Sequence, residues 1–158
     1  MQTITINQQV KLSDGEVRQL RNLWNNEYPL SLNYLRVEDF VLYLTRLENA
    51  RHYFIKNEEE SIVAWAFDFK RDTDQWFGII VDSSMQGKGF GTLLLNKLKE
   101  NNTTLNGWMI DRDTDIKSNG QYYKSPAEFY KKNAFKLNPL ERMGFDKISA
   151  IKITWKQN

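Results

Sequence analysis

The sequence predicts an α/β (α+β) fold in which helices cover both faces of a central sheet. Residues 62–69 and 76–81 are strand-like and apolar on both sides of the pleat, which is typical of strands in the middle of a covered sheet. The second strand is followed by a loop with three glycines and then by a leucine-rich helical segment. Helical and strand-like patterns also follow one another along the rest of the chain.

The N-terminal part of the chain predicts one short strand and two helices. Residues 4–6 alternate isoleucine with threonine, which indicates a first strand. Ser13 and Glu16 have the spacing of a capping box and predict a helix start. That helix should end at Tyr28, because Pro29 disfavours helical geometry in the residue before it. Apolar residues at helical spacing between positions 37 and 47 predict the second helix.

The middle of the chain predicts most of the sheet. We expect strands at residues 52–56, 62–69 and 76–81, with Gly78 and Ile80 on the same face as Ala64 and Ala66. A helix at residues 92–98 should cover one face, and residues 105–111 should form the next strand. Residues 112–124 are polar and contain an Asn-Gly pair, so we expect a loop there.

The C-terminal part predicts a short helix and two strands. Ser125 as N-cap, Pro126 at the first helical position and Glu128 as the capping-box acid indicate where the helix begins, and it should end near Asn133. Apolar stretches at residues 135–143 and 148–155 predict the two strands. Pro139 restricts the first of them to a sheet edge, because proline cannot donate to a ladder.

The composition limits the function further. A length of 158 residues predicts one domain, residues 1–158, and 41% hydrophobic residues indicate a packed core. The chain has no cysteine and a single histidine, His52, so we expect no disulfide, no cysteine nucleophile and no metal site. We expect His52 and the aromatic residues, Trp65, Trp76 and Tyr43 among them, to be structural.

Charge and hydropathy exclude other partners. The formal net charge is +2, from 22 basic and 20 acidic residues, which gives no support for binding to nucleic acid or to a membrane. The N-terminus lacks the pattern of a signal peptide, and no apolar run reaches the roughly 18–20 residues that span a bilayer. We therefore expect a cytoplasmic protein.

The loop after residue 81 has the chemistry of a phosphate cradle. Residues 86–91 have the sequence Gln-Gly-Lys-Gly-Phe-Gly and precede a helix, where N–H groups and the helix dipole favour an anion. A Walker loop would need glycine in place of Asp82 and a hydroxyl residue in place of Gly89. A dinucleotide fingerprint would need glycine in place of Thr92. Neither pattern fits.

This loop, together with the motif at residues 129–135, resembles the GNAT superfamily of N-acetyltransferases. The second motif runs from Phe129-Tyr130 to Phe135 and is close to the family's F-Y-x-x-x-G-F. The resemblance implies a mixed, mostly antiparallel sheet of about seven strands, splayed between the fourth and fifth strands and flanked by about four helices. The chain departs from the family at Ser83, often proline, and at Ala134, usually glycine. We expect Asn133 to take over the left-handed turn.

The resemblance implies an N-acetyltransferase that moves an acetyl group from acetyl-CoA to a primary amine in a ternary complex. Main-chain N–H groups of the glycine loop would bind the diphosphate, with Lys88 as an electrostatic aid, and the fourth strand would pair with the pantetheine arm and stabilise the oxyanion. The residues expected to bind acetyl-CoA are Ile80, Val81, Gln86, Gly87, Lys88, Gly89, Phe90, Gly91 and Thr92.

Two further residues are candidates for the chemistry. By its position in the second motif, Tyr130 would steady or protonate the departing CoA thiolate. Asp111, at the end of a predicted strand, is the favoured general base, because an amine with a pKa near 10.4 arrives mostly protonated. The alternatives that remain open are a water chain without a dedicated base, or one of the carboxylates Asp68, Asp82, Asp113 and Glu27.

Several partners and one other function remain open. The acceptor is expected to be a small-molecule amine or a protein amine, contacted by the connection at residues 26–32, and the protein is expected to be a monomer or a homodimer. Another acyl group could replace acetyl. A non-catalytic domain that binds acyl-CoA as a sensor would keep the glycine loop but would need neither Tyr130 nor a base.

Overall fold

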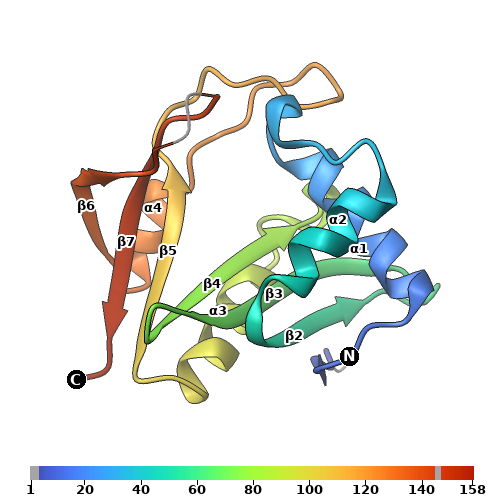
Figure 1. Ribbon diagram of the computed structural model, residues 1–158, viewed down its shortest axis with the longest axis horizontal. Coiled ribbons are helices and arrows are strands. Elements are labelled where there is room, and N and C mark those ends of the chain that lie inside the picture. The colour runs from blue at the N-terminus through green and yellow to red at the C-terminus, as the bar shows by residue number, and fades with distance from the viewer. Residues whose placement is uncertain (1–3, 145–146) are drawn as a thin grey trace.

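A computed structural model describes residues 4–144 and 147–158, and in these ranges the chain forms one seven-stranded sheet flanked by four α-helices (Figure 1). The strand order is β1-β2-β3-β4-β5-β7-β6. The elements are β1 (Asn7–Gln9), α1 (Asp14–Glu27), α2 (Val37–Thr45), β2 (Glu48–Lys56), β3 (Ile62–Arg71), β4 (Asp74–Val81), α3 (Phe90–Glu100), β5 (Thr104–Ile110), α4 (Ala127–Lys132), β6 (Lys136–Arg142) and β7 (Ala150–Lys156). Two short 3-10 helices, η1 (Leu30–Leu32) and η2 (Ser83–Met85), lie in the connections. The predicted fold class and element order are confirmed.

The sheet divides into two halves between β4 and β5. These two strands run parallel and share a single paired position, Trp76 with Asn106, whereas every other neighbouring pair is antiparallel. Beyond Trp76 the two strands diverge. The predicted mixed sheet, splayed between its fourth and fifth strands, is therefore confirmed.

The two faces of the sheet carry separate cores. Helices α1 and α2 cover one face, where Leu20 and Phe40 pack against Trp65 and Phe67. Helices α3 and α4 cover the other face, where Leu94 and its neighbours pack against small residues of β3 (Figure 1). None of the helices in the described ranges is long and apolar enough to cross a membrane.

The prediction of which β4 residues share a face with β3 residues was wrong. In the observed register Phe67 pairs with Gly78 and Trp65 pairs with Ile80, so Gly78 and Ile80 lie on the aromatic face. A Cβ atom at Gly78 would lie 2.6 Å from the ring of Phe67. The glycine therefore makes room for a ring on the neighbouring strand, which a single-strand pattern cannot reveal.

The helix starts illustrate what local sequence decides. At α1 the predicted capping box is present: the Ser13 hydroxyl accepts from the Glu16 N–H at 3.1 Å, and the Glu16 carboxylate accepts from the Ser13 N–H at 2.8 Å. Helix α4, by contrast, begins after Pro126 and has no side-chain cap. The Ser125 N–H donates to Asp113 at 2.7 Å, so a tertiary contact positions this serine outside the helix.

Two other local predictions were wrong. The first strand is β1 at Asn7–Gln9 rather than residues 4–6, because pairing with β2 selects the segment. At the end of α4, Ala134 takes the left-handed conformation, with φ +69°, whereas Asn133 stays at φ −99°. The Asn133 side chain donates to the Phe129 carbonyl at 2.8 Å, which holds it in the last turn. Pro139 lies in β6 at the sheet edge, as predicted.

Candidate active site

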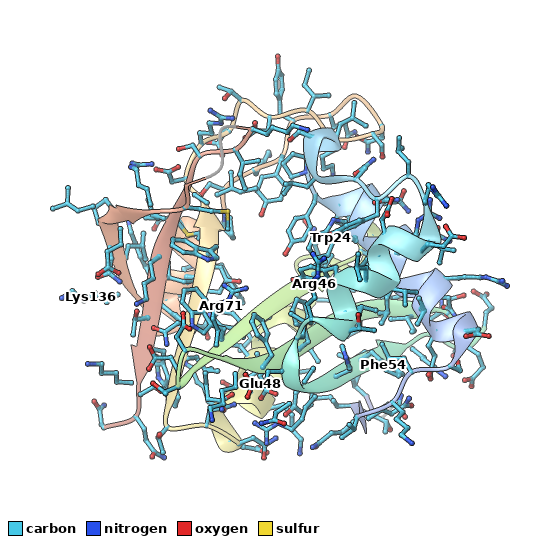
Figure 2. The ribbon with its side chains drawn as sticks, viewed as in Figure 1. Trp24, Arg46, Glu48, Phe54, Arg71 and Lys136 are labelled. Atoms are coloured by element: carbon cyan, nitrogen blue, oxygen red, sulfur yellow. The ribbon has the colours of Figure 1, made fainter. Side chains whose placement is uncertain are left out.

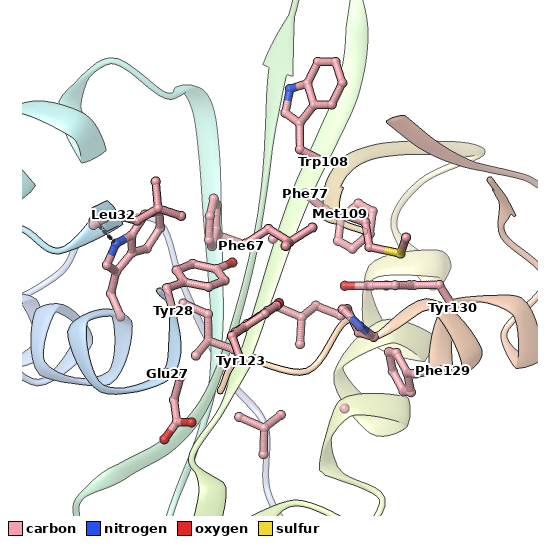
Figure 3. A pocket seen from close by; sticks show the side chains of 18 of the residues that line it. Glu27, Tyr28, Leu32, Phe67, Phe77, Trp108, Met109, Tyr123, Phe129 and Tyr130 are labelled. Atoms are coloured by element: carbon pink, nitrogen blue, oxygen red, sulfur yellow. Dashed lines mark hydrogen bonds between the residues drawn. The ribbon is translucent and has the colours of Figure 1, made fainter. Parts of the chain in front are cut away.

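A cavity of about 840 Å³ lies where β4 and β5 diverge. Its walls come from β4, β5, α1, α4, the loop after β4 and the segment that follows β5 (Figure 3). Aromatic side chains dominate these walls, and Glu27 is the one carboxylate among the lining residues that the structure describes. The cavity reaches both faces of the sheet, since it touches Phe67 on one face and Tyr130 on the other.

The glycine loop, residues 86–92, forms one end of the cavity. Gly87 and Gly89 have φ values of +79° and +86°, which side chains other than glycine rarely adopt. Open space surrounds both, because no atom lies within 4 Å of an added Cβ. Gly89 is the N-cap of α3 and provides no side-chain hydrogen bond to the first N–H groups of the helix. Those N–H groups and the helix dipole therefore remain available to an anion.

Eight of the nine residues predicted to bind acetyl-CoA lie in the cavity wall. They are Ile80, Val81, Gln86, Gly87, Gly89, Phe90, Gly91 and Thr92. The ninth, Lys88, is exposed and is not among the lining residues; its ammonium lies 3.9 Å from the Met85 sulfur. The structure thus brings the strand end and the glycine loop together and leaves the lysine on the outer surface.

The side of β4 that faces β5 offers main-chain groups to a ligand. Because β4 pairs with β5 only at Trp76, the segment from Phe77 to Val81 has no neighbouring strand on that side. The Gln86 side chain donates to the Val81 carbonyl at 3.1 Å and ties the glycine loop to the strand end. An extended ligand arm could therefore pair with β4 in the manner of an added strand.

Three tyrosines, Tyr28, Tyr123 and Tyr130, line the middle of the cavity. Figure 3 shows the Tyr28 and Tyr130 hydroxyls pointing into the cavity from opposite walls. Within residues 4–144 and 147–158, none of the three hydroxyls has a hydrogen-bond partner. Burial raises the pKa of Tyr130 above its usual value, and the proximity of Tyr28 raises it further. The phenols are neutral donors across the physiological pH range. Tyr28 falls in the connection at residues 26–32 that is expected to contact the acceptor, whereas no local motif marks Tyr123.

Asp111 lies outside the cavity wall. The Ser149 hydroxyl donates to one of its oxygens at 2.6 Å and the Arg142 guanidinium donates to the other at 3.0 Å. Burial acts to raise the pKa of Asp111, but these hydrogen bonds outweigh it and lower the pKa below its usual value. Its oxygens are therefore already engaged in holding β5 to the β6–β7 hairpin.

The other candidate carboxylates are also engaged. Asp68 is buried and accepts from Arg51, Tyr53 and Asn102. Asp82 caps η2 and Asp113 accepts from Ser125. Glu27 is the member of this group that lies in the cavity wall.

Glu27 joins three segments that are far apart in the sequence. It accepts from the Ser83 N–H at 2.9 Å and from the Ser83 hydroxyl at 2.5 Å, and its carboxylate lies 3.3 Å from the Lys117 ammonium. Glu27 and Lys117 are each only 8% exposed. The ion pair connects the end of α1 to the segment after β5, and the Ser83 hydrogen bonds connect it to the start of the loop after β4. No sequence spacing marks Lys117, which falls in a stretch predicted only as a polar loop.

The crossing segment, residues 112–124, runs from the end of β5 across to the end of α1 (Figure 1). It bonds to the other side of the cavity through the Leu30 N–H, which donates to the Ile116 carbonyl at 2.8 Å, and through the Ser118 hydroxyl, which donates to the Asn25 carbonyl at 3.1 Å. Its last residues, Tyr123 and Lys124, line the cavity.

The single histidine, His52, is buried in the core. His52 is 3% exposed, and its Nδ1 accepts from the Trp65 indole N–H at 3.1 Å. Burial lowers the pKa of His52 to about 4, so it is a neutral acceptor inside the core. In the part of the chain that the structure describes, no group of three or more histidine, cysteine, aspartate or glutamate residues could hold a metal ion.

The chain belongs to the acetyltransferase (GNAT) domain family, which matches residues 48–137. This stretch begins with β2 and ends in β6, and it contains the glycine loop and Tyr130. The resemblance inferred from the two motifs is thereby confirmed. Among curated proteins, no sequence matches this chain.

Solved structures share the fold over nearly the whole chain. An aminoglycoside 6'-N-acetyltransferase complexed with coenzyme A is 15% identical, with a TM-score of 0.70 and coverage of 96% of each chain. An aminoglycoside 6'-acetyltransferase type Ii is 18% identical, with a TM-score of 0.69 and the same coverage. Mutant forms of the spermidine/spermine N-acetyltransferase SpeG from Vibrio cholerae are 15% identical, with a TM-score of 0.66 and coverage of 98% of this chain and 95% of theirs.

Proposed function

We propose that this protein is an acetyl-CoA-dependent N-acetyltransferase that acts on a primary amine by direct attack in a ternary complex. The observation that carries the proposal is one cavity that contains the glycine loop, the open side of β4 and the Tyr130 hydroxyl. Bound acetyl-CoA would supply an activated acetyl group as a thioester. The fit rests on the left-handed glycines and on the uncapped N–H groups of α3, which suit a diphosphate.

The open side of β4 would orient the acyl donor. Main-chain groups between Phe77 and Val81 would pair with the pantetheine arm, and one N–H there would donate to the carbonyl oxygen as negative charge develops. Such a donor typically contributes about 3–4 kcal/mol in the transition state. The centroid of the Tyr130 ring lies 5.9 Å from that of the Phe77 ring, so the Tyr130 ring packs beside the start of this open segment.

Tyr130 would act on the sulfur that leaves. A free thiol has a pKa near 8.5 and tyrosine one near 10, and burial raises the pKa of Tyr130 further. Full proton transfer from Tyr130 is therefore uphill. We assign Tyr130 the role of a hydrogen-bond donor that steadies the thiolate while the carbon–sulfur bond breaks.

The amine must also lose a proton, and we propose that it leaves through water in the cavity rather than to Asp111. Both Asp111 oxygens accept hydrogen bonds, and the residue does not line the cavity. Glu27 lines it, but its oxygens are held by Ser83 and Lys117. Its proposed role is to position the start of the loop after β4.

The experiment has two stages. A thermal-shift measurement with acetyl-CoA should raise the melting temperature, and incubation of acetyl-CoA with a panel of primary amines should then release CoA thiol. Binding without release across the panel would favour the non-catalytic sensor. Absence of any shift at millimolar acetyl-CoA would contradict both functions.

A further inference from the structure

The cavity extends well beyond the region that an acyl donor would occupy. Strand β4 runs from Asp74 to Val81, a span of about 23 Å at 3.3 Å per residue. The glycine loop lies at the Val81 end. Arg71 lies opposite Asp74 in the β3–β4 register and also lines the cavity. This arginine is thus at the far end from the diphosphate site and on the side left for the acceptor.

Aromatic rings form the walls at this far end. On the face covered by α1 and α2, the aromatic lining residues include Tyr34, Tyr43, Phe67, Phe69, Trp76 and Trp108. The Trp76 and Trp108 rings have their centroids 5.4 Å apart. Such walls favour an apolar or aromatic body over a hydrated one.

Two aromatic rings flank the Arg71 guanidinium at this end of the cavity. Figure 2 shows Arg71 near the point where the two halves of the sheet diverge. Its guanidinium lies 5.1 Å from the Phe69 ring centroid and 5.0 Å from that of Trp76. Contact with two rings restricts the guanidinium, and no described residue accepts a hydrogen bond from it. Among the described residues it forms no ion pair.

The charges around Arg71 do not suit a polycation. The Lys152 ammonium lies 5.5 Å from the centroid of the Trp76 ring and forms a 3.7 Å ion pair with the exposed Glu141. Glu27, the one carboxylate among the described lining residues, is already paired with Lys117. Among the described lining residues, a second or third ammonium on an acceptor would find no unpaired acid and would meet Arg71 instead.

We infer that the acceptor is a primary amine with an aromatic or apolar body and an anionic group, such as a carboxylate, that Arg71 binds. This inference rests on the proposed acetyl transfer. Trp76, which contacts Arg71, lies two residues, about 7 Å, from Gly78 at the open side of β4. An acceptor with one aromatic ring could therefore place its amine at the open side of β4 and its anion at Arg71. The planar guanidinium suits a carboxylate in a bidentate contact.

Matched probes test this inference by equilibrium binding to protein saturated with CoA. The probes are para-(aminomethyl)benzoate, benzylamine, which differs by the carboxylate alone, and spermidine. The benzoate should bind at least about tenfold more tightly than benzylamine, and spermidine should bind most weakly. Arg71→Gln should remove the tenfold difference while benzylamine binds as before, and Arg71→Lys should recover part of it.

Two controls keep the result interpretable. Arg18→Gln, at an exposed position of α1 outside the cavity wall, should leave all three affinities unchanged. The thermal shift with CoA should persist in Arg71→Gln, which shows that the variant is folded. Equal binding of the benzoate and benzylamine, preference for spermidine, or equal losses for all probes in Arg71→Gln would overturn the inference.

Turnover separates this inference from the proposed function. Acetylation of benzylamine without any effect of Arg71 would support acetyl transfer and overturn the anion subsite. Binding of the benzoate that depends on Arg71, with no acetylation of any amine, would overturn acetyl transfer and support the anion subsite. In the expected case, kcat/KM is highest for the benzoate and falls about tenfold in Arg71→Gln.

Discussion

The glycine loop and the crossing segment border the same cavity but are built in opposite ways. The glycine loop takes its shape from its own residues, since Gly87 and Gly89 allow the left-handed turns and α3 follows directly. The crossing segment takes its place from distant partners, through the ion pair of Lys117 with Glu27 and through a main-chain hydrogen bond to η1. A ligand site can thus combine a wall encoded by a short motif with a wall encoded only by the fold.

The largest expected effect breaks the anchor of the crossing segment. Lys117→Met leaves the buried Glu27 carboxylate without its cation, which should lower the free energy of unfolding by about 3–5 kcal/mol. Urea unfolding monitored by tryptophan fluorescence measures this loss. The double variant Glu27→Gln with Lys117→Met removes both charges and should recover much of the stability. If the single variant is as stable as the wild type, the pair does not anchor the segment.

The next effect compares two tyrosines from the two sides of the cavity. Tyr130→Phe should lower kcat by about 100-fold, with the acetyl-CoA dissociation constant nearly unchanged, because the lost hydroxyl would act on the leaving sulfur. Its stability should change little, since the hydroxyl makes no hydrogen bond in the described part of the fold. Tyr123→Phe, in the crossing segment, should lower kcat by less than about tenfold. Steady-state kinetics would contradict the role of Tyr130 if both variants turned over alike.

A pair of glycine variants sharpens the comparison further. Gly89 and Gly120 have φ values of +86° and +85°, and no atom lies within 4 Å of an added Cβ at either. Alanine at each position should therefore cost a similar amount of stability, about 1–2 kcal/mol. Only Gly89→Ala should raise the acetyl-CoA dissociation constant, by about tenfold, because only this loop would contact the diphosphate. Equal affinities in calorimetry would argue against a diphosphate at the loop.

The smallest expected effect concerns Asp111, which precedes the crossing segment. Asp111→Asn should give a pH–rate profile that overlays that of the wild type, because the carboxylate lies outside the cavity wall. The lowered pKa of Asp111 affects the stability of the fold instead. The ionised carboxylate stabilises the folded state at pH values above the usual carboxyl pKa, and this stabilisation is lost as the pH falls through the lowered pKa. If Asp111→Asn lost the part of the profile in which the rate rises with pH, Asp111 would be the general base.

Local patterns predicted most of the fold. The capping box at Ser13, the break at Pro29 and the edge position of Pro139 each depend on the chemistry of one or a few neighbouring residues, and each is present. The predictions for Ser125, Asn133 and the first strand were wrong because a tertiary contact or a strand pairing overrode the local preference.

The glycine loop, Tyr130 and the order of the elements follow from short motifs in the sequence, because backbone freedom and helix starts are properties of adjacent residues. Tertiary structure alone decided that Tyr28, Tyr123 and Tyr130 line one cavity, that Glu27 pairs with Lys117 across 90 positions, and that Arg71 lies against two rings with no ion pair to another described residue. Such encounters depend on strand register and on how two halves of a sheet diverge. Contacts between distant segments carry no spacing that a linear pattern can reveal.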